Sequence, residues 1–201
     1  MPPITDIVKH LILINVIVFL AVAFSPLGRY IPDLAVFWVK DPRFQPYQLV
    51  SHMFMHANMT HLFFNMFALY VFGPMVERYA GPKKFLSLYF AAGAGSVLAH
   101  LGIMFFQNSV YGVQLFPPAV GASGAIMGVL VAFAVLYPNV RLMLLFPPIP
   151  IKAKYLAMAY VAIDLFSGVS GYNTGVANWA HLGGAVTGFI FTSIWIKVWR
   201  R

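Results

Sequence analysis

The residues most able to do chemistry in this 201-residue chain are a serine set among glycines and a histidine near the C-terminal end. Ser123 lies in the stretch GASGAIMG and is its only reactive side chain, and His181 lies in the stretch NWAHLGGAVTG. A serine hydroxyl becomes a strong nucleophile when a neutral imidazole within hydrogen-bonding reach accepts its proton. The two residues together therefore indicate nucleophilic catalysis, with Ser123 as the nucleophile and His181 as the base.

A third stretch, HLFFN, carries groups that could stabilise the oxyanion that forms when a nucleophile attacks a carbonyl. His61 and Asn65 are four residues apart, so they share one helix face. Such an oxyanion needs preorganised donors, and we expect the Asn65 amide, the His61 ring and the Ser123 backbone N–H to supply them. Nothing in the sequence places Asp164 on His181, so the residues predict a Ser–His dyad.

The composition shows which elements must position these groups. The chain is 61% hydrophobic and 9% charged, whereas soluble domains are about 45–50% apolar and about 25% charged. Its apolar segments approach or exceed the ~17–25 residues that a transmembrane helix needs. We therefore expect an all-α membrane protein, a single domain over residues 1–201 with six transmembrane helices. The expected spans are approximately residues 8–25, 54–76, 84–106, 119–137, 153–170 and 178–198.

The basic residues predict the orientation of these spans. Six spans put both termini on one side of the membrane, and that side carries ten of the 13 Lys and Arg residues, against three in the loop between the first two spans. Because basic residues concentrate on the cytoplasmic side, we expect both termini in the cytoplasm and a plasma (inner) membrane location. The net charge of +8 is then a matter of topology and does not indicate a nucleic-acid partner.

The first loop, residues 26–52, is long and unusually apolar. It mixes Tyr, Trp and Phe with prolines and a few charges, as in GRYIPDLAVFWVKDPRFQPYQLV. Aromatic residues of this kind gather at the membrane–water interface. We expect an interfacial element that lies partly in the outer leaflet, with its aromatic rings at headgroup level.

Three of the spans bring polar residues to a similar depth. Ser123 lies about five residues past Pro118, roughly 7 Å inside its span, and His61 and His181 lie near the starts of theirs. GxxxG spacing on the fourth and sixth spans would let their backbones approach closely. The residues expected to support the site are Gly121, Gly124, Gly128, Gly184, Gly188, His56, Met127 and Asn178.

Each of these features taken singly has an ordinary explanation, and only their joint pattern favours catalysis. A serine in a membrane helix usually bonds to its own helix carbonyls, and GxxxG is common in membrane proteins. His52 and His56 could ligate a metal, but a third ligand is not evident and the HExxH pattern is missing, so we predict no metal and no cofactor. A transporter or channel would show repeated halves or charged residues at mid-membrane. The sequence shows no such repeat, and Asp164 is its only clearly buried acid.

At these residues the chain resembles a known family. HLFFN, GASG and AHLGGAVTG match the motifs HxxxN, GxSG and AHxxGxxxG of the rhomboid intramembrane serine proteases, in the same order and on the expected spans. The resemblance covers essentially the whole chain. It implies a six-helix rhomboid-like bundle with a large interfacial first loop, and an endopeptidase that cuts transmembrane segments near their outer ends through a Ser–His dyad and an acyl-enzyme.

The resemblance also implies the role of each residue and the partners. Ser123 matches the nucleophile, His181 the general base, and His61 and Asn65 the oxyanion-side residues. The run IDLFSG resembles the end of the fifth span, which helps to gate substrate entry in the family, and residues 168–178 are expected to cap the site. The implied partners are transmembrane substrate proteins and the lipid bilayer, with the site opening to the outer side. The alternative is a non-catalytic rhomboid-like protein that binds membrane helices.

Two positions depart from the pattern of many rhomboids. A Trp-Arg pair that supports the first loop in the family is replaced by Tyr47-Gln48. An aromatic residue that stacks on the catalytic histidine is replaced by Met127, whose flexible side chain packs on an imidazole less rigidly. Neither departure removes a catalytic group.

Overall fold

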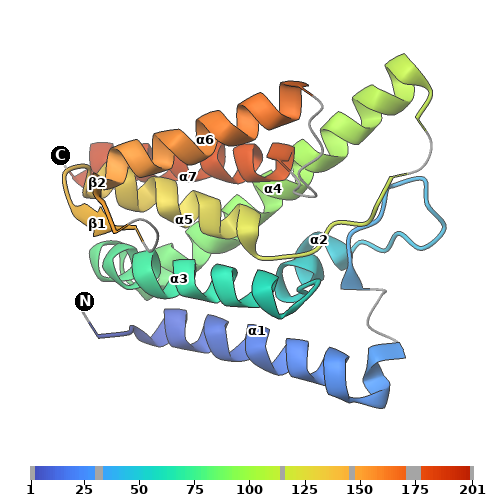
Figure 1. Cartoon of the computed structure of the whole chain (residues 1–201), viewed down its shortest axis with the longest axis horizontal. Coiled ribbons are helices and arrows are strands. Elements are labelled where there is room, and N and C mark those ends of the chain that lie inside the picture. Colours follow the sequence, from blue (N-terminus) through green and yellow to red (C-terminus); the bar gives the residue numbers. More distant parts are fainter. Residues whose placement is uncertain (1–2, 30–33, 114–115, 145–147, 171–177, 200–201) are drawn as a thin grey trace.

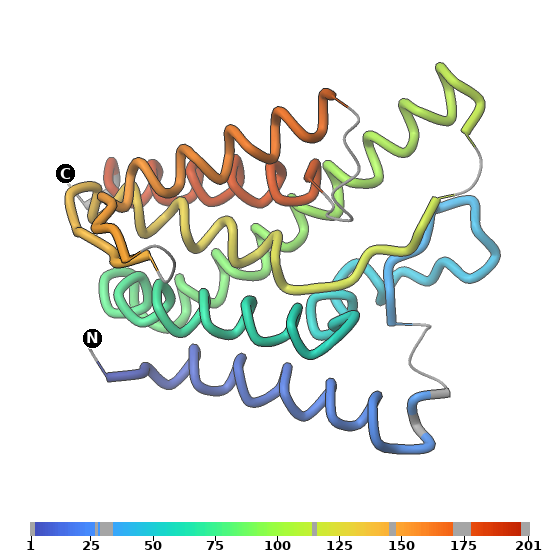
Figure 2. Tube along the Cα trace, viewed as in Figure 1, coloured from blue at the N-terminus to red at the C-terminus, as the bar shows by residue number. Residues whose placement is uncertain are grey.

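The helices of this protein form a bundle in which both ends of the chain lie on one side. The computed structural model describes residues 3–29, 34–113, 116–144, 148–170 and 178–199. Figure 1 shows the start of α1 (Asp6–Phe24) and the end of α7 (Asn178–Trp199) at the same end of the bundle. Along the chain, four further helices connect α1 to α7, and the tube in Figure 2 traces them in order. They are α3 (Met59–Ala80), α4 (Pro82–Tyr111), α5 (Ser123–Leu136) and α6 (Ala153–Ser170).

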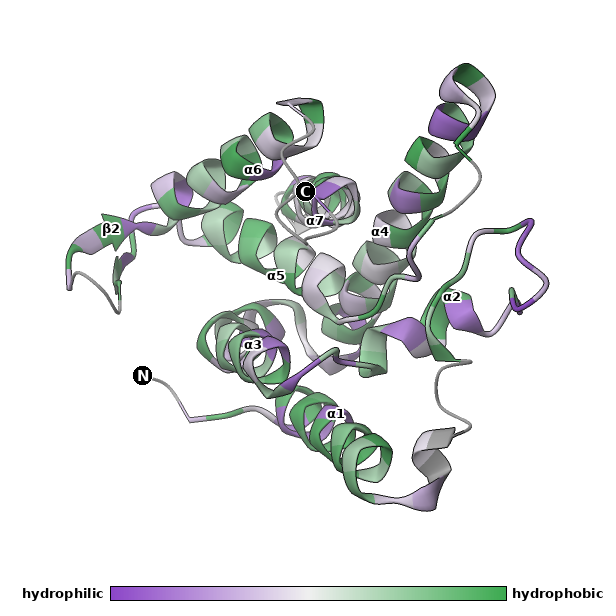
Figure 3. Ribbon diagram, turned by 45° about the vertical axis from the view of Figure 1, so that its right-hand side comes forward, coloured by the Kyte–Doolittle hydropathy of each residue, from purple (hydrophilic) through white to green (hydrophobic). Residues whose placement is uncertain are grey.

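Four helices are long and apolar enough to cross a membrane by length and composition, namely α1, α3, α4 and α7. The other two, α5 with 14 residues and α6 with 18, occupy the positions of the expected fourth and fifth spans. At 1.5 Å per residue α5 is about 21 Å long, which is less than the ~30 Å thickness of a bilayer core. Most residues of the helices are apolar, as the green parts of the ribbon in Figure 3 show.

Two predicted helix starts are wrong for identifiable reasons. The second span was expected from residue 54, but α3 begins at Met59 because Asn58 is its N-cap and accepts a hydrogen bond of 2.8 Å from the His61 N–H. The fourth span was expected from residue 119, but Ala119 is extended and pairs with Val36 through two hydrogen bonds of 3.0 Å. The helical rise of roughly 7 Å before Ser123 therefore does not exist.

Elements outside the predicted spans lie at the two ends of the bundle. Beside the chain termini, β1 (Arg141–Met143) and β2 (Pro150–Lys152) form an antiparallel hairpin that the sequence analysis did not predict. In the described part of the first loop lie the 3-10 turns Pro26–Arg29 and His52–Phe54 and the short helix α2 (Gln48–Ser51). The loop lies at the opposite end, as Figure 1 shows.

Two of the loop aromatics lie inside the protein, and the depth of the loop in the bilayer stays a prediction. Phe37 and Trp38 are buried, with 4% and 6% of their surface exposed. The Trp38 ring lies 5.3 Å from the ring of Phe116, and the Arg43 guanidinium lies 4.3 Å from the centre of the Phe37 ring. The loop turns these rings inward because the protein itself offers apolar partners for them. Tyr47, by contrast, is half exposed.

Gln48 organises the end of this loop from a fully buried position. Its side-chain amide donates to the Arg43 carbonyl (2.9 Å) and accepts from the Gln45 N–H (3.0 Å). Its own carbonyl oxygen lies 2.9 Å from Nδ1 of His52. Gln48 thus ties together the loop segment where many rhomboids carry the Trp-Arg pair.

Replacing this amide tests its contribution to the loop. Gln48→Ala should destabilise the protein by about 1–2 kcal/mol, because two partly buried hydrogen bonds to the backbone of Arg43 and Gln45 would be lost. The thermal unfolding midpoint in detergent measures the loss, and Tyr47→Ala at the half-exposed neighbour should change stability by no more than about 0.5 kcal/mol. Equal midpoints for Gln48→Ala and the wild type would show that the loop does not depend on this amide.

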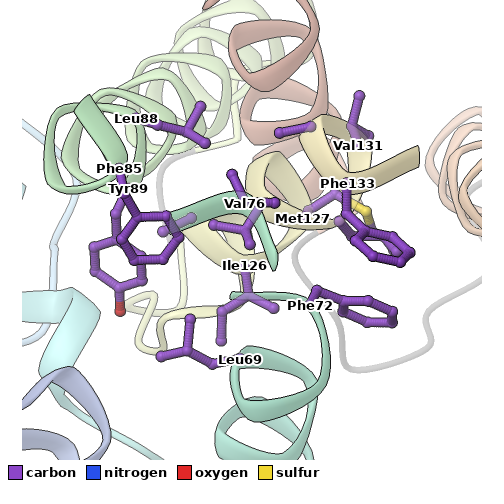
Figure 4. Packing of buried hydrophobic residues seen from close by; sticks show 14 of the residues in the cluster. Leu69, Phe72, Val76, Phe85, Leu88, Tyr89, Ile126, Met127, Val131 and Phe133 are labelled. Atoms are coloured by element: carbon purple, nitrogen blue, oxygen red, sulfur yellow. The ribbon is translucent and has the colours of Figure 1, made fainter. Parts of the chain in front are cut away.

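The core lies between α3, α4 and α5. Figure 4 shows side chains of these three helices interlocking; those labelled are Leu69, Phe72, Val76, Phe85, Leu88, Tyr89, Ile126, Met127, Val131 and Phe133. The rings of Phe72 and Phe133 are 5.3 Å apart. Because apolar contacts within a bilayer gain little from the hydrophobic effect, close packing of this kind holds the helices together.

Glu77 is a second buried acid, so Asp164 is not the only one. The Glu77 carboxylate accepts hydrogen bonds from the hydroxyl of Thr5 (2.5 Å) and the backbone N–H groups of Ile7 (3.2 Å) and Val8 (3.1 Å). It thereby satisfies the first N–H groups of α1, which have no carbonyl partners within their own helix. Glu77 thus links the start of α1 to the C-terminal end of α3.

Glycines bring α4, α5 and α7 into backbone contact. A Cβ atom on Gly184 would overlap the carbonyl oxygen of Gly124, and one on Gly188 would overlap that of Gly128. A Cβ on Gly183 would overlap the carbonyl of Gly95 on α4 in the same way. The two GxxxG pairs thus face each other, as their spacing predicts. We refer to these contacts as the glycine seam.

The glycine seam predicts a large difference between two glycine substitutions. Gly184→Ala should destabilise the protein by about 1–3 kcal/mol, because the added methyl group meets backbone that cannot rotate away. Gly102→Ala on α4 is the matched control, since a Cβ there meets nothing within 4 Å, and it should be neutral or stabilising by up to about 1 kcal/mol. Unfolding midpoints in detergent compare the two, and equal effects would contradict the seam.

Candidate active site

Three helix starts bring the predicted catalytic residues to one end of the bundle. Ser123 is the first residue of α5, His61 the third residue of α3 and His181 the fourth residue of α7. Figure 1 shows these starts at the end of the bundle away from the chain termini. The first N–H groups of a helix have no carbonyl partners within the helix and carry partial positive charge. The backbone at Ser123 is therefore suited to an oxyanion.

Gly121 connects the first loop to the serine. Its N–H donates to the His52 carbonyl (2.9 Å), and its φ of +119° is one that residues with a side chain rarely adopt. A Cβ at this position would lie 2.8 Å from Nε2 of His61 and 3.8 Å from Oγ of Ser123. Only glycine lets the His61 ring lie against the chain just before the serine.

The two ring nitrogens of His61 face different parts of the chain. The Ala57 N–H lies 3.5 Å from Nδ1, at the outer limit of a hydrogen bond. Nε2 lies beside Gly121, two residues before the serine. Asn65 is buried and its side-chain amide donates to the His61 carbonyl (2.8 Å). An amide nitrogen carries two protons, so this bond uses one of them.

A cavity lies beside the serine. Its polar lining comes from Ser123, His52, Ser96 and His100, and Ala180, which precedes His181, also contributes to it. Nε2 of His100 is buried and has no hydrogen-bond partner among the described residues. A cavity with several polar groups can hold water, which hydrolysis requires.

The two loop histidines near the serine are neutral at physiological pH. Burial lowers the pKa of His52 to about 4, and burial together with the nearby His61 lowers the pKa of His56 to about 4. The His56 ring lies 5.1 Å from the His61 ring, edge to face. Among the described residues there is no group of three or more His, Cys, Asp or Glu side chains that could hold a metal ion.

These lowered pKa values predict how stability depends on pH. An unfolded histidine has a pKa of about 6.5, so between about pH 6.5 and pH 4 the unfolded chain binds more protons than the folded one. Stability must therefore fall as the pH falls through this range, by on the order of 2–3 kcal/mol for each histidine. His56→Gln should flatten the dependence of the unfolding midpoint on pH. An unchanged slope in His56→Gln would contradict the burial of a neutral ring.

Asp164, which the sequence could not connect to the site, lies against His181. Its Oδ2 is 3.1 Å and its Oδ1 3.3 Å from Nδ1 of the His181 ring. Asn178 donates from its side-chain amide to Oδ1 of Asp164 at 2.9 Å. The only sequence signal was a single acid near the end of an apolar span. Its neighbours depend on how α6 rotates against α7, which hydropathy does not reveal.

The other predicted support residues are placed as follows. Gly124, Gly128, Gly184 and Gly188 lie in the glycine seam. Met127 is buried in the core among the residues of α3 and α5, as Figure 4 shows, and its contact with the His181 ring stays a prediction. The predicted cap over residues 168–178 falls mostly on 171–177, outside the described residues. Within the described part, Gly168 packs close to the Trp179 ring.

Comparison with known proteins gives a consistent result. A Rhomboid domain matches residues 43–198. The chain is similar to "Rhomboid protease AarA" of Providencia stuartii, with 33% identity over 159 residues that cover 73% of this chain and 54% of that protein. It is also similar to "RHOMBOID-like protein 12, mitochondrial" of Arabidopsis thaliana, with 32% identity over 71% of this chain and 44% of that protein. With "Rhomboid protein 1, mitochondrial" of Saccharomyces cerevisiae it shares 31% identity over 71% of this chain and 40% of that protein. The chain thus spans about half the length of these relatives, or less.

Proposed function

The chain belongs to the rhomboid family, and from that premise we propose that it is an intramembrane serine endopeptidase that cleaves transmembrane segments of other proteins. The observation that carries the proposal is the placement of Ser123 at the start of α5, directly across the glycine seam from the helix that bears His181. The family supports intramembrane proteolysis in general, and the residues of this chain support the chemistry that follows.

In the first step, Ser123 and His181 act together. Because Nδ1 of His181 faces Asp164, Nε2 is the nitrogen available to the serine. Nε2 accepts the hydroxyl proton while Oγ attacks the scissile carbonyl carbon, and the carbonyl oxygen becomes an oxyanion. The protonated ring then gives its proton to the leaving amine nitrogen as the peptide bond breaks. An acyl-enzyme on Ser123 remains.

The oxyanion would be held by donors from two helices. The Ser123 backbone N–H at the start of α5, Nε2–H of His61 and the Asn65 amide are the candidates. Each such donor is worth about 2.7–4 kcal/mol of transition-state stabilisation in related chemistry. A water molecule, activated by His181, then hydrolyses the acyl-enzyme. The cavity beside Ser123, lined by His52, Ser96 and His100, is where we propose that this water is held.

Substrate would enter from the bilayer between α3 and α6. Ile163, Phe166 and Val169 of α6 and Phe63 and Phe64 of α3 expose more than half of their surface, as expected of helix faces in contact with lipid. Since α5 is only about 21 Å long, Ser123 at its start would lie below the membrane surface. A substrate helix must then unwind near its outer end to present a carbonyl to Ser123.

We further propose that the protein crosses the plasma (inner) membrane six times, with both termini cytoplasmic and the site opening to the outer side. The excess of ten basic residues over three on the side of the termini supports this orientation. Figure 1 shows the start of α1 and the end of α7 at one end of the bundle, as six spans require.

Cleavage of a reporter in proteoliposomes tests the proposed function. The reporter has one transmembrane helix with Gly and Ala residues in its outer third. The wild type should cut it there, and Ser123→Ala and His181→Ala should each lower the rate by at least about 10³-fold, because removing either member disables the pair. Ser87→Ala is the control, since Ser87 is exposed and bonds to the Lys83 carbonyl of its own helix.

Two outcomes would overturn the proposal. Cleavage by Ser123→Ala at the wild-type rate would place the nucleophile elsewhere. Capture of the intact reporter by the wild type, with no cleavage at any reporter sequence, would replace the protease by the rhomboid-like binding protein.

A further inference from the structure

Asp164 is a buried carboxylate on an apolar helix, and the proposed dyad does not explain it. Only 5% of its surface is exposed, although α6 turns many apolar side chains outward. Transferring a carboxylate out of water costs several kcal/mol unless partners compensate for it. The hydrogen-bond partners of Asp164 therefore indicate the role of this carboxylate.

Among the described residues, the hydrogen-bond partners of Asp164 come from the first turn of α7. Asn178 donates to Oδ1 at 2.9 Å, and Nδ1 of His181 lies 3.1 Å from Oδ2. Asn178 and His181 are three residues apart, so they point from one face of α7. Asn178 holds one carboxylate oxygen and leaves the other directed at the ring. The side chains of His181 and Asp164 expose only 16% and 8% of their surface, so water screens the pair weakly.

We infer that Asp164 is a positioning residue for His181, which extends the proposed dyad to a Ser–His–Asp arrangement whose acid comes from α6. The inference rests on the proposed function. The carboxylate accepts the Nδ1–H bond, which fixes the tautomer that leaves the Nε2 lone pair for Ser123. It also stabilises the imidazolium that forms when Nε2 takes the proton. Asp164 itself does not touch the substrate and takes up no proton.

Because Asp164 lies on α6, the orientation of the His181 ring on α7 depends on a second helix. His181 belongs to α7, which the glycine seam holds against α4 and α5. Asp164 belongs to α6, which packs on α7 through contacts such as Gly168 with Trp179. The His181 ring is therefore oriented only while α6 lies against α7.

A purely structural role is the competing explanation, because the same contacts join α6 to α7. Asp164→Asn separates the two explanations: the amide has the shape of the carboxylate but carries no charge and can leave His181 in the wrong tautomer. Ser87→Ala is the control, since Ser87 is exposed and bonds to the Lys83 carbonyl of its own helix, away from the site.

The full-length variants are assayed on the reporter described above and with a fluorophosphonate. Asp164→Asn should lower kcat by about 10²–10⁴-fold, with KM within twofold of the wild type and a similar unfolding midpoint. Its labelling by the fluorophosphonate should slow in parallel, since labelling needs an activated serine and no substrate helix. Ser87→Ala should stay within twofold of the wild type in both assays.

The pH profile of kcat gives a readout that packing alone would not move. Without the neighbouring negative charge, the imidazolium is less stable, so the acid limb of the profile should shift to lower pH in Asp164→Asn. The other titratable groups near His181 are His61 of α3 and His100 of α4, which lines the cavity beside Ala180; α5 contributes none within Ser123–Leu136. These groups are unchanged in the variant.

The inference is overturned if Asp164→Asn keeps kcat within threefold of the wild type, or if its kcat falls with the unfolding midpoint and the acid limb stays in place. The Ser123→Ala protein, assayed in parallel, separates this failure from failure of the proposed function. An inactive Ser123→Ala beside an active Asp164→Asn removes only the role of Asp164. Cleavage by Ser123→Ala at the wild-type rate would instead overturn the proposed role of Ser123 as the nucleophile.

Discussion

The close approach of α5 and α7 is the constraint on which the rest of the structure depends. It exists because Gly124 and Gly128 face Gly184 and Gly188, so that backbone lies against backbone where any Cβ would overlap a carbonyl oxygen. In a bilayer, packing of this kind replaces the hydrophobic effect as the force between helices. The same contact puts the start of α5 beside the first turn of α7, so the glycines that stabilise the bundle also bring together the helix starts that carry Ser123 and His181, the proposed nucleophile and base.

A second set of contacts aligns the serine from the loop side. Gln48 is fully buried and bonds to His52, whose carbonyl holds the N–H of Gly121, two residues before Ser123. The positive φ of Gly121 then makes room for the ring of His61. Site geometry thus combines a close-packed glycine seam on one side with a chain of buried polar contacts on the other.

The sequence predicted the features that depend on composition and spacing, and missed those that depend on the rotation of one element against another. The approximate extents of the six long helices and the facing GxxxG pairs follow from local patterns. The inward turn of Trp38 does not, because it depends on Phe116, which is distant in sequence. The start of α3 at Met59 is different, since the Asn58 cap is a local signal that the analysis of hydropathy overlooked. The contact of Asp164 with His181 joins two helices whose mutual rotation is set by packing.

The most direct test of the central claim is the rate at which a fluorophosphonate modifies Ser123, followed residue by residue by mass spectrometry in the wild type and in His181→Ala. The account predicts modification of Ser123 alone, at least about 100-fold slower without the imidazole. Equal rates in the two proteins, or modification of another serine such as Ser96 in the same cavity, would contradict the claim that the seam brings an activating base to Ser123.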